Sequence, residues 1–171
     1  MTMPLRLTGS YRLKLDAKGR ISIPVEHRRL IEFANLGASF YFTIGSNGKL
    51  WGHPSVAYEE WLDTIPREMN PESPQLDYVH LHAAAIKTAW DDQGRIVIPA
   101  DLLAEANVGE DVAFVGALDH VEIWRFSDWT DHRAKIWKGA PDIVRKWKNS
   151  TKTISAPPLE NARAGETFAS G

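Results

Sequence analysis

The stretch from Leu15 to Pro24 reads L-D-A-K-G-R-I-S-I-P, and it returns from Trp90 to Pro99 as W-D-D-Q-G-R-I-V-I-P. From the aspartate to the proline, six of the nine positions are identical in the two copies. An internal repeat of this kind determines how many structural units a chain contains. The sequence therefore predicts two related units, one around each copy.

The first copy has the pattern of a strand, a turn and a second strand. Apolar residues alternate with polar ones over 11–15 and again over 20–23, and a period of two is typical of strands. Because strand side chains point alternately to two faces, the aliphatic residues line one face and the polar residues line the other. The polar face carries Arg12, Lys14, Arg20 and Ser22. One face of this predicted hairpin is therefore cationic.

Both copies use the same residues in the turn. Asp16 and Asp91 suit the turn because an aspartate carboxylate can accept a hydrogen bond from a nearby backbone N–H. Gly19 and Gly94 supply positions with positive φ. Pro24 ends the second strand of the first copy and suits the first turn of a following helix. The signature turn residues are thus an aspartate and a glycine in each copy.

The paired D-x-x-x-R signatures, Asp16 to Arg20 and Asp91 to Arg95, are each followed by I-x-I-P. They resemble the MraZ family of bacterial transcriptional regulators, whose domains belong to the SpoVT-AbrB swapped-hairpin group. The resemblance covers about residues 5 to 130. It includes Gly9, Arg28, Trp51, Trp61, the segment V-G-A-L-D-H-V-E-I-W from Val115 to Trp124, and Trp129.

The resemblance implies an α/β fold of the mixed α+β type. Two tandem SpoVT-AbrB-like swapped-hairpin repeats would exchange strands and form an intrachain pseudo-dimeric β-barrel flanked by short helices. Local patterns predict strand, strand, helix, strand, strand, helix in each half. The predicted organisation is a first repeat at 5–61, a linker and helix at 62–85, a second repeat at 86–130, a basic C-terminal helix at 131–149 and a disordered tail at 150–171.

Composition limits the class of protein. The chain has 171 residues with 43% apolar content, enough for a core in one ordinary domain or two small ones. It contains no cysteine, which excludes disulfides and thiolate metal sites. No apolar run is long enough for a signal peptide or a membrane span. We therefore expect a cytoplasmic protein with no membrane partner.

The net charge of −2 hides a strong segregation of charge along the chain. Residues 1–31 hold seven Lys or Arg against two acidic residues, whereas 86–129 hold three against nine. Residues 130–171 hold eight against four. Only the first repeat and the C-terminal segment can therefore offer a cationic surface to phosphate.

Arg20 has two interpretations. An exposed guanidinium can pair with guanine edges or hold a phosphate, but the same side chain could close the turn by bonding Asp16. Spacing alone favours the internal ion pair, because such pairs are common on protein surfaces. The resemblance favours DNA, since in the family the arginine of the first D-x-x-x-R is a DNA-binding residue.

Four more cations are candidates for DNA contact. Lys14, Lys18 and Arg12 lie beside Arg20 in the basic first repeat, and we expect them to contact phosphate rather than bases. An ordinary solvated strand face is the alternative for these three. Arg95 holds the family position in the second repeat, but the carboxylate of Asp92 should repel the phosphate backbone. Arg28 and Arg29 on the following helix are secondary candidates.

No pattern in the sequence indicates catalysis, a metal or a cofactor. His80 and His82 form an H-x-H, but residues two apart on a helix do not share a face, and no third ligand is close in sequence. Asp91 and Asp92 could act as a general acid and a general base, but two adjacent residues on a turn need not point toward the same substrate. We therefore expect a protein that is not an enzyme.

The resemblance implies a sequence-specific DNA-binding regulator that acts as a repressor on repeated motifs upstream of its own division and cell-wall operon. It also implies a ring-shaped homo-oligomer associated with the nucleoid. Two alternatives stay open. The chain could be a protein-interaction module for the ribosomal RNA methyltransferase encoded beside it in the family, or a nucleoid-type binder without sequence preference.

Overall fold

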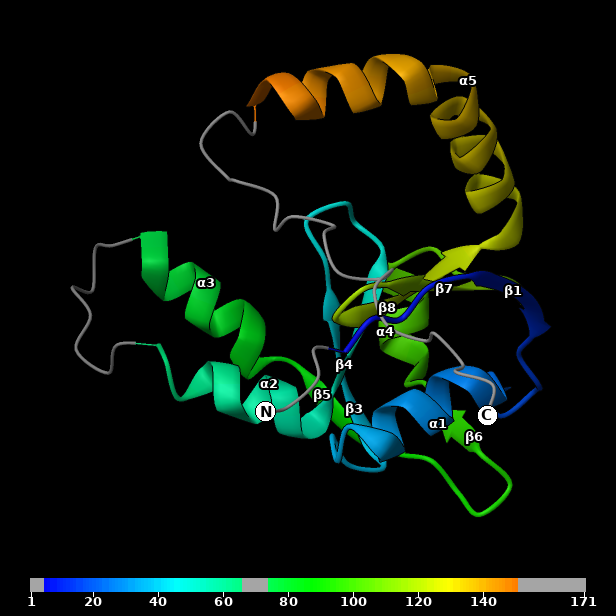
Figure 1. The fold of residues 1–171 in the computed structure, drawn as a ribbon. Helices are drawn as coiled ribbons and strands as arrows, with labels where there is room; N and C mark the ends of the chain where they lie inside the picture. Colours follow the sequence, from blue (N-terminus) through cyan, green and yellow to red (C-terminus); the bar gives the residue numbers. More distant parts are fainter. Residues whose placement is uncertain (1–4, 66–73, 151–171) are drawn as a thin grey trace, which may run out of the picture. The chain divides into compact units, whose positions relative to one another are not determined.

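The computed structural model describes residues 5–65 and 74–150 and divides into two compact units, Met1–Asp131 and His132–Gly171 (Figure 1). The disordered tail predicted at 150–171, apart from its first residue, falls outside the described residues, as does Ser73, a residue type that favours the N-cap of a helix. The elements of the first half are β1 (Ser10–Lys14), β2 (Arg20–Ser22), α1 (Val25–Phe33), β3 (Ser39–Ile44), β4 (Leu50–Pro54) and α2 (Ser55–Leu62). Those that follow are α3 (Pro74–Ala83), β5 (Ile86–Ala89), β6 (Arg95–Val97), α4 (Ala100–Glu105), β7 (Asp111–Ala117), β8 (His120–Arg125) and α5 (Phe126–Ser150).

The strands form two antiparallel sheets, which confirms the mixed α+β class. The larger sheet has six strands in the order β1-β7-β8-β4-β3-β5, and β2 pairs with β6 in a two-stranded ribbon. The two strands around the first turn, β1 and β2, therefore do not pair with each other. Each pairs with a strand from the other half of the chain, and the edge strand β5 likewise pairs with β3.

The sequence pattern explains which side chains enter the core. In β1, Arg12 and Lys14 are exposed while Tyr11 and Leu13 are partly buried, as the alternation predicts. The core joins apolar residues of both sheets with those of the helices. Its largest fully buried side chains include Phe40, Phe42, Phe114, Ile21, Ile31, Ile96 and Ile98.

Proline starts the two short helices that follow the ribbon strands. Pro24 precedes α1 with φ −53° and ψ 132°, and Pro99 precedes α4 with φ −56° and ψ 139°. Because the ring restricts φ, each proline holds the chain extended at the end of a ribbon strand and allows the helix to begin at the next residue.

The final helix is longer than the basic helix predicted at 131–149. α5 begins at Phe126, inside the predicted second repeat, and continues to Ser150. It includes Pro141 in its interior. Proline costs an interior helix one backbone hydrogen bond but its φ is compatible with helix, so the rest of a long helix can retain it. Within the second unit, Trp137, Ile143 and Val144 are exposed on this basic helix.

Candidate nucleic-acid interface

The two signature turns have the same hydrogen-bond pattern. In the first, Asp16 Oδ1 accepts the backbone N–H groups of Lys18 at 2.8 Å and Arg20 at 3.0 Å. In the second, Asp91 Oδ1 accepts those of Gln93 at 3.0 Å and Arg95 at 2.9 Å. The aspartates therefore hold the turns as the sequence indicates, by accepting local backbone N–H groups.

The turn glycines are required by conformation and by space. Gly19 has φ +72° and Gly94 has φ +73°, in the left-handed region that favours glycine. A Cβ at Gly19 would lie 2.8 Å from the carbonyl oxygen of Ile98, and one at Gly94 would overlap the guanidinium of Arg28. Each turn thus packs closely against a segment from the other half of the chain.

Each arginine is bonded to the aspartate of its own turn. Arg20 Nε donates to Asp16 Oδ2 at 2.6 Å, while Arg95 donates to Asp91 Oδ2 from Nε at 2.9 Å and Nη2 at 2.7 Å. The side chains of Arg20 and Arg95 are 33% and 35% exposed. Among the described residues, neither Nη atom of Arg20 makes a hydrogen bond. The internal ion pair and an outward contact are therefore compatible, because the pair uses only one edge of the guanidinium.

The ribbon brings the two arginines onto one face. Arg20 lies opposite Val97 and Arg95 lies opposite Ser22, and between these pairs Ile21 lies opposite Ile96. Residues directly opposite or two apart share a face, so the arginines project together and the two isoleucines project the other way. Both isoleucines are fully buried, whereas Val97 is 45% exposed. The arginine Cα atoms are diagonal neighbours, about 7–8 Å apart by strand geometry.

The other predicted contacts do not all join this face. Arg12 lies on the six-stranded sheet, where its guanidinium binds both carboxylate oxygens of Asp111 and lies 4.2 Å from the ring centroid of Phe126. Lys14 also lies on β1 and is opposite Asp111. Lys18 is exposed at the tip of the first turn, near Arg20 in sequence and structure. Of these three cations, Lys18 belongs to the same turn as a ribbon arginine.

Arg28 occupies a more central place than its sequence position suggests. Its guanidinium packs over Gly94, so a cation of the first half lies at the turn of the second half. The internal repeat is the sequence feature that could have identified Arg28. Arg28 stands four residues after Pro24, and the equivalent residue after Pro99 is Leu103. The substitution of a cation for an aliphatic residue at matching positions could have singled it out.

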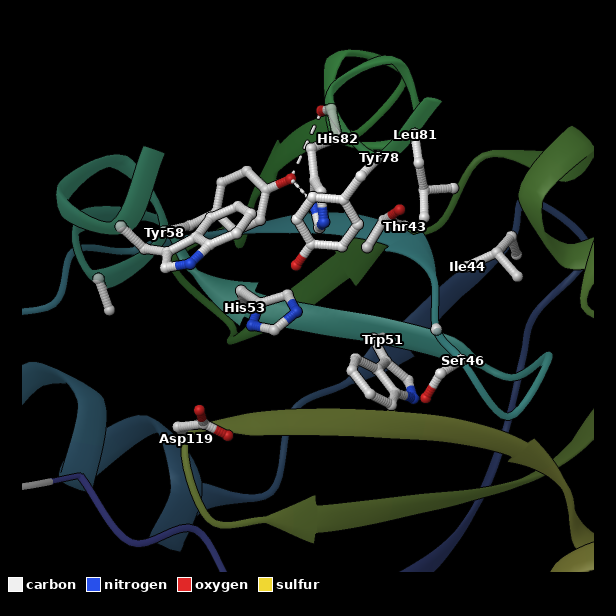
Figure 2. Close-up of a pocket in the computed structure, with 13 residues that line it drawn as sticks. Thr43, Ile44, Ser46, Trp51, His53, Tyr58, Tyr78, Leu81, His82 and Asp119 are labelled. Carbon is white, nitrogen blue, oxygen red and sulfur yellow. Dashed lines mark hydrogen bonds between the residues drawn. The ribbon is translucent and has the colours of Figure 1, made fainter. Parts of the chain in front are cut away.

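A second concave region was not found by sequence reasoning. A cavity of about 560 Å³ lies among β3, β4, α2, α3 and the turn before β8. Figure 2 shows Trp51, His53, Tyr58 and Tyr78 around it. His82, half of the H-x-H, lines this cavity with its Nδ1 2.7 Å from the hydroxyl of Tyr58. Within 5–65 and 74–150, no three His, Asp or Glu side chains are grouped so as to hold a metal ion.

These features define a mixed α+β protein with two D-x-x-x-R turns on an antiparallel ribbon. The family described as "MraZ protein, putative antitoxin-like" matches residues 7–77 and 81–140. The transcriptional regulator MraZ of Lactiplantibacillus plantarum is 35% identical over 142 residues, 80% of this chain and 94% of that protein. That of Lachnoclostridium phytofermentans is 34% identical over 122 residues, 71% of this chain and 82% of that protein. The chain belongs to the MraZ family.

No helix in the part of the chain that the structure describes is long and apolar enough to cross a bilayer.

Proposed function

We propose that the chain is a transcription regulator that binds double-stranded DNA through the β2–β6 ribbon, in the cytoplasm at the nucleoid. The observation that carries this proposal is the shared exposed face of Arg20 and Arg95 on a ribbon whose other face is buried. The major groove of B-DNA admits a two-stranded ribbon, and arginine can donate two hydrogen bonds to one guanine. The curated relatives are named as transcriptional regulators, which supports the same role here.

The two arginines differ in what they can offer to DNA. Arg20 is bonded through Nε alone, whereas Arg95 uses Nε and Nη2 on Asp91. The first turn also carries Lys18, while the second carries the extra carboxylate of Asp92. We therefore assign Arg20 the main contact and Arg95 a smaller one. Lys18, with Lys14 and Arg12 at the edge of the larger sheet, would contact phosphate.

The strand pairing supports a pseudo-dimeric arrangement of two swapped-hairpin repeats that close into a barrel. Ile21 and Ile96, equivalent in the two copies, pair with each other at the centre of the ribbon. In the two repeats, β1 corresponds to β5, β3 to β7 and β4 to β8. When each strand of the larger sheet is replaced by its counterpart, the strand order is the same read from the opposite edge. A pseudo-two-fold axis through the pair of isoleucines relates the halves and places the two turns symmetrically on the ribbon.

Assembly into a ring would repeat the ribbon around the oligomer. Several weak contacts could then engage several DNA repeats at once, and the effective concentration of the second contact would raise the overall affinity. We propose that the target is a set of repeats upstream of the chain's own division and cell-wall operon. An oligomer on the promoter would repress transcription by steric exclusion.

The test is fluorescence-anisotropy binding of the full chain to DNA from upstream of its own gene, at two salt concentrations. We expect Arg20→Ala to lower the specific affinity about 5- to 150-fold, because a lost bidentate base contact costs about 1–3 kcal/mol. Arg95→Ala should cost less. The logarithm of the binding constant should fall with the logarithm of salt by about 0.9 per phosphate neutralised.

The matched control is Arg145→Ala, which removes an arginine that also pairs with a nearby aspartate, Asp142 at 2.8 Å, but lies on α5. It should leave the preference for upstream DNA over random DNA unchanged, because a phosphate contact from the basic C-terminal segment carries no sequence information. If the wild type binds random DNA as well as its own upstream DNA, the chain is a nucleoid-type binder instead. If it binds neither, the protein-interaction alternative replaces the proposal, and capture of the methyltransferase in high salt tests it.

A further inference from the structure

The cavity of about 560 Å³ shares no residue with the two signature turns. Its walls come from β3, β4, α2, α3 and the turn between β7 and β8 (Figure 2). Cavities of roughly 300–1,000 Å³ with largely apolar walls are the size that binds small organic molecules. A ligand could therefore enter without displacing the DNA-binding ribbon.

Four tryptophan and tyrosine side chains line the cavity. Tyr58 and Trp61 from α2 lie with ring centroids 5.5 Å apart, and Trp61 meets Tyr78 of α3 edge to face at 6.0 Å. Trp51 of β4 lies over the imidazole of His120 at 4.2 Å. The faces of tryptophan and tyrosine rings carry negative electrostatic potential and attract cations within about 6 Å. The wall therefore favours a positively charged ligand with a flat or apolar body.

Two imidazoles that line the cavity stay uncharged near neutral pH. Burial, followed by the nearby charge of His120, lowers the pKa of His53 to about 4. Burial also lowers the pKa of His82. No hydrogen bond between described residues uses the ring nitrogens of His53. A neutral imidazole repels no cation and can accept a hydrogen bond from an N–H donor.

Two carboxylates give the region a net negative charge. Asp119 is 82% exposed and lies 2.7 Å from Nδ1 of His120, and Glu122 lies 3.5 Å from its Nε2. Burial opposes the charge of His120, but hydrogen bonds with Glu122 and Asp119 outweigh this and raise its pKa. Even with His120 protonated, two carboxylates face one imidazolium. The remaining charge is negative, and Asp119 is the carboxylate that lines the cavity.

We propose that this cavity binds a small organic cation, a protonated or quaternary amine carried on an aromatic body. The body packs between the rings of α2, α3 and Trp51, and the ammonium group lies between the Asp119 carboxylate and the neutral ring of His53. The carboxylates exclude an anion of the same shape. A neutral molecule of that shape gains the packing but not the charge interaction.

The test uses three probes with one indole body: tryptamine, tryptophol and indole-3-acetate. Isothermal titration calorimetry on the full chain at neutral pH should show tryptamine binding about tenfold or more tightly than tryptophol, as expected for a cation on partly desolvated aromatic faces. Indole-3-acetate should bind weakest. Equal affinity for the three probes, or no saturable binding of tryptamine at millimolar concentration, would overturn the proposal.

Two variants locate the site. Asp119→Asn should weaken tryptamine binding several-fold while leaving tryptophol unchanged, and Tyr78→Leu, at a ring that is 51% exposed, should weaken both probes. Asp101→Asn, which removes a carboxylate from α4 outside the cavity, is the matched control and should change neither. Circular dichroism checks that each variant is folded. An equal loss in Asp119→Asn and Asp101→Asn would show a general charge effect and refute the site, whereas the DNA-binding proposal would stand.

Discussion

Asp16 uses both of its side-chain oxygens to hold the first turn. One oxygen accepts hydrogen bonds from two backbone N–H groups, and the other accepts a hydrogen bond from Nε of Arg20. These bonds, led by the backbone N–H of Arg20, lower the pKa of Asp16 from 3.8 to about 2. A carboxyl group whose pKa is lower in the folded state than in the unfolded chain stabilises the fold at pH values above its pKa in the unfolded chain. That contribution disappears as the pH falls through the folded value.

We expect this contribution to be visible in acid unfolding. The wild type should lose the stabilisation from Asp16 as the pH falls from about 4 to about 2, because folding then requires the release of a proton. Asp16→Asn has no such proton, so the difference in Tm between the two proteins should shrink across this range. Thermal unfolding followed by circular dichroism at several pH values measures it. Asp101→Asn controls for the loss of one exposed carboxylate, and a constant difference for Asp16→Asn would contradict the expectation.

The β2–β6 ribbon is the element that connects the core to the proposed DNA contact. Ile21 and Ile96 face the core, and the residues beside them face solvent. The burial of one face holds the ribbon in a single orientation, because a register shift of one residue would expose the isoleucines and bury the arginines. The aliphatic residues of I-x-I-P therefore position the arginines that precede them.

Two neighbouring substitutions in β6 test this orientation. Ile96→Ala should lower the free energy of unfolding by about 2–5 kcal/mol, since it leaves a cavity in the core. Val97→Ala, on the exposed face, should change it by about 0.5 kcal/mol or less. Urea unfolding at equilibrium gives both values. Similar losses in the two variants would show that the ribbon does not have one buried and one exposed face.

At the scale of the whole molecule, the two halves complete each other. β1 and β2 find their partners in β7 and β6, and β5 finds its partner in β3. Neither half contains all the strands that its own strands pair with. The backbone N–H and C=O groups and the apolar faces of each half are therefore satisfied only in the complete chain.

Fragments of the chain should behave accordingly. Residues 1–85 and 86–171, expressed separately, should each lack a cooperative thermal transition, because β1, β2 and β5 have no partner strand. An equimolar mixture should regain such a transition as the two fragments pair. Circular dichroism during heating and amide NMR spectra of each fragment alone measure this. A dispersed spectrum and a cooperative transition for either fragment by itself would contradict the expectation.

The sequence by itself determined the local features of this protein. The repeat, the aspartate and glycine of each turn, the prolines before the helices and the alternation in β1 all rest on interactions between neighbours in the chain. They also placed Arg20 beside Asp16, and the structure shows that this ion pair forms. The resemblance in the two D-x-x-x-R signatures led to the family that the comparisons show.

Only the tertiary structure decided which distant segments meet. It separated Arg12 from Arg20, placed Arg28 against Gly94 and gathered the cavity from elements as far apart as Thr43 and Asp119. No local pattern carries this information, because strand register and cavity walls are set by how apolar faces from both halves pack together. The turns are therefore properties of short segments, whereas the shared face of the arginines and the aromatic cavity are properties of the packed chain.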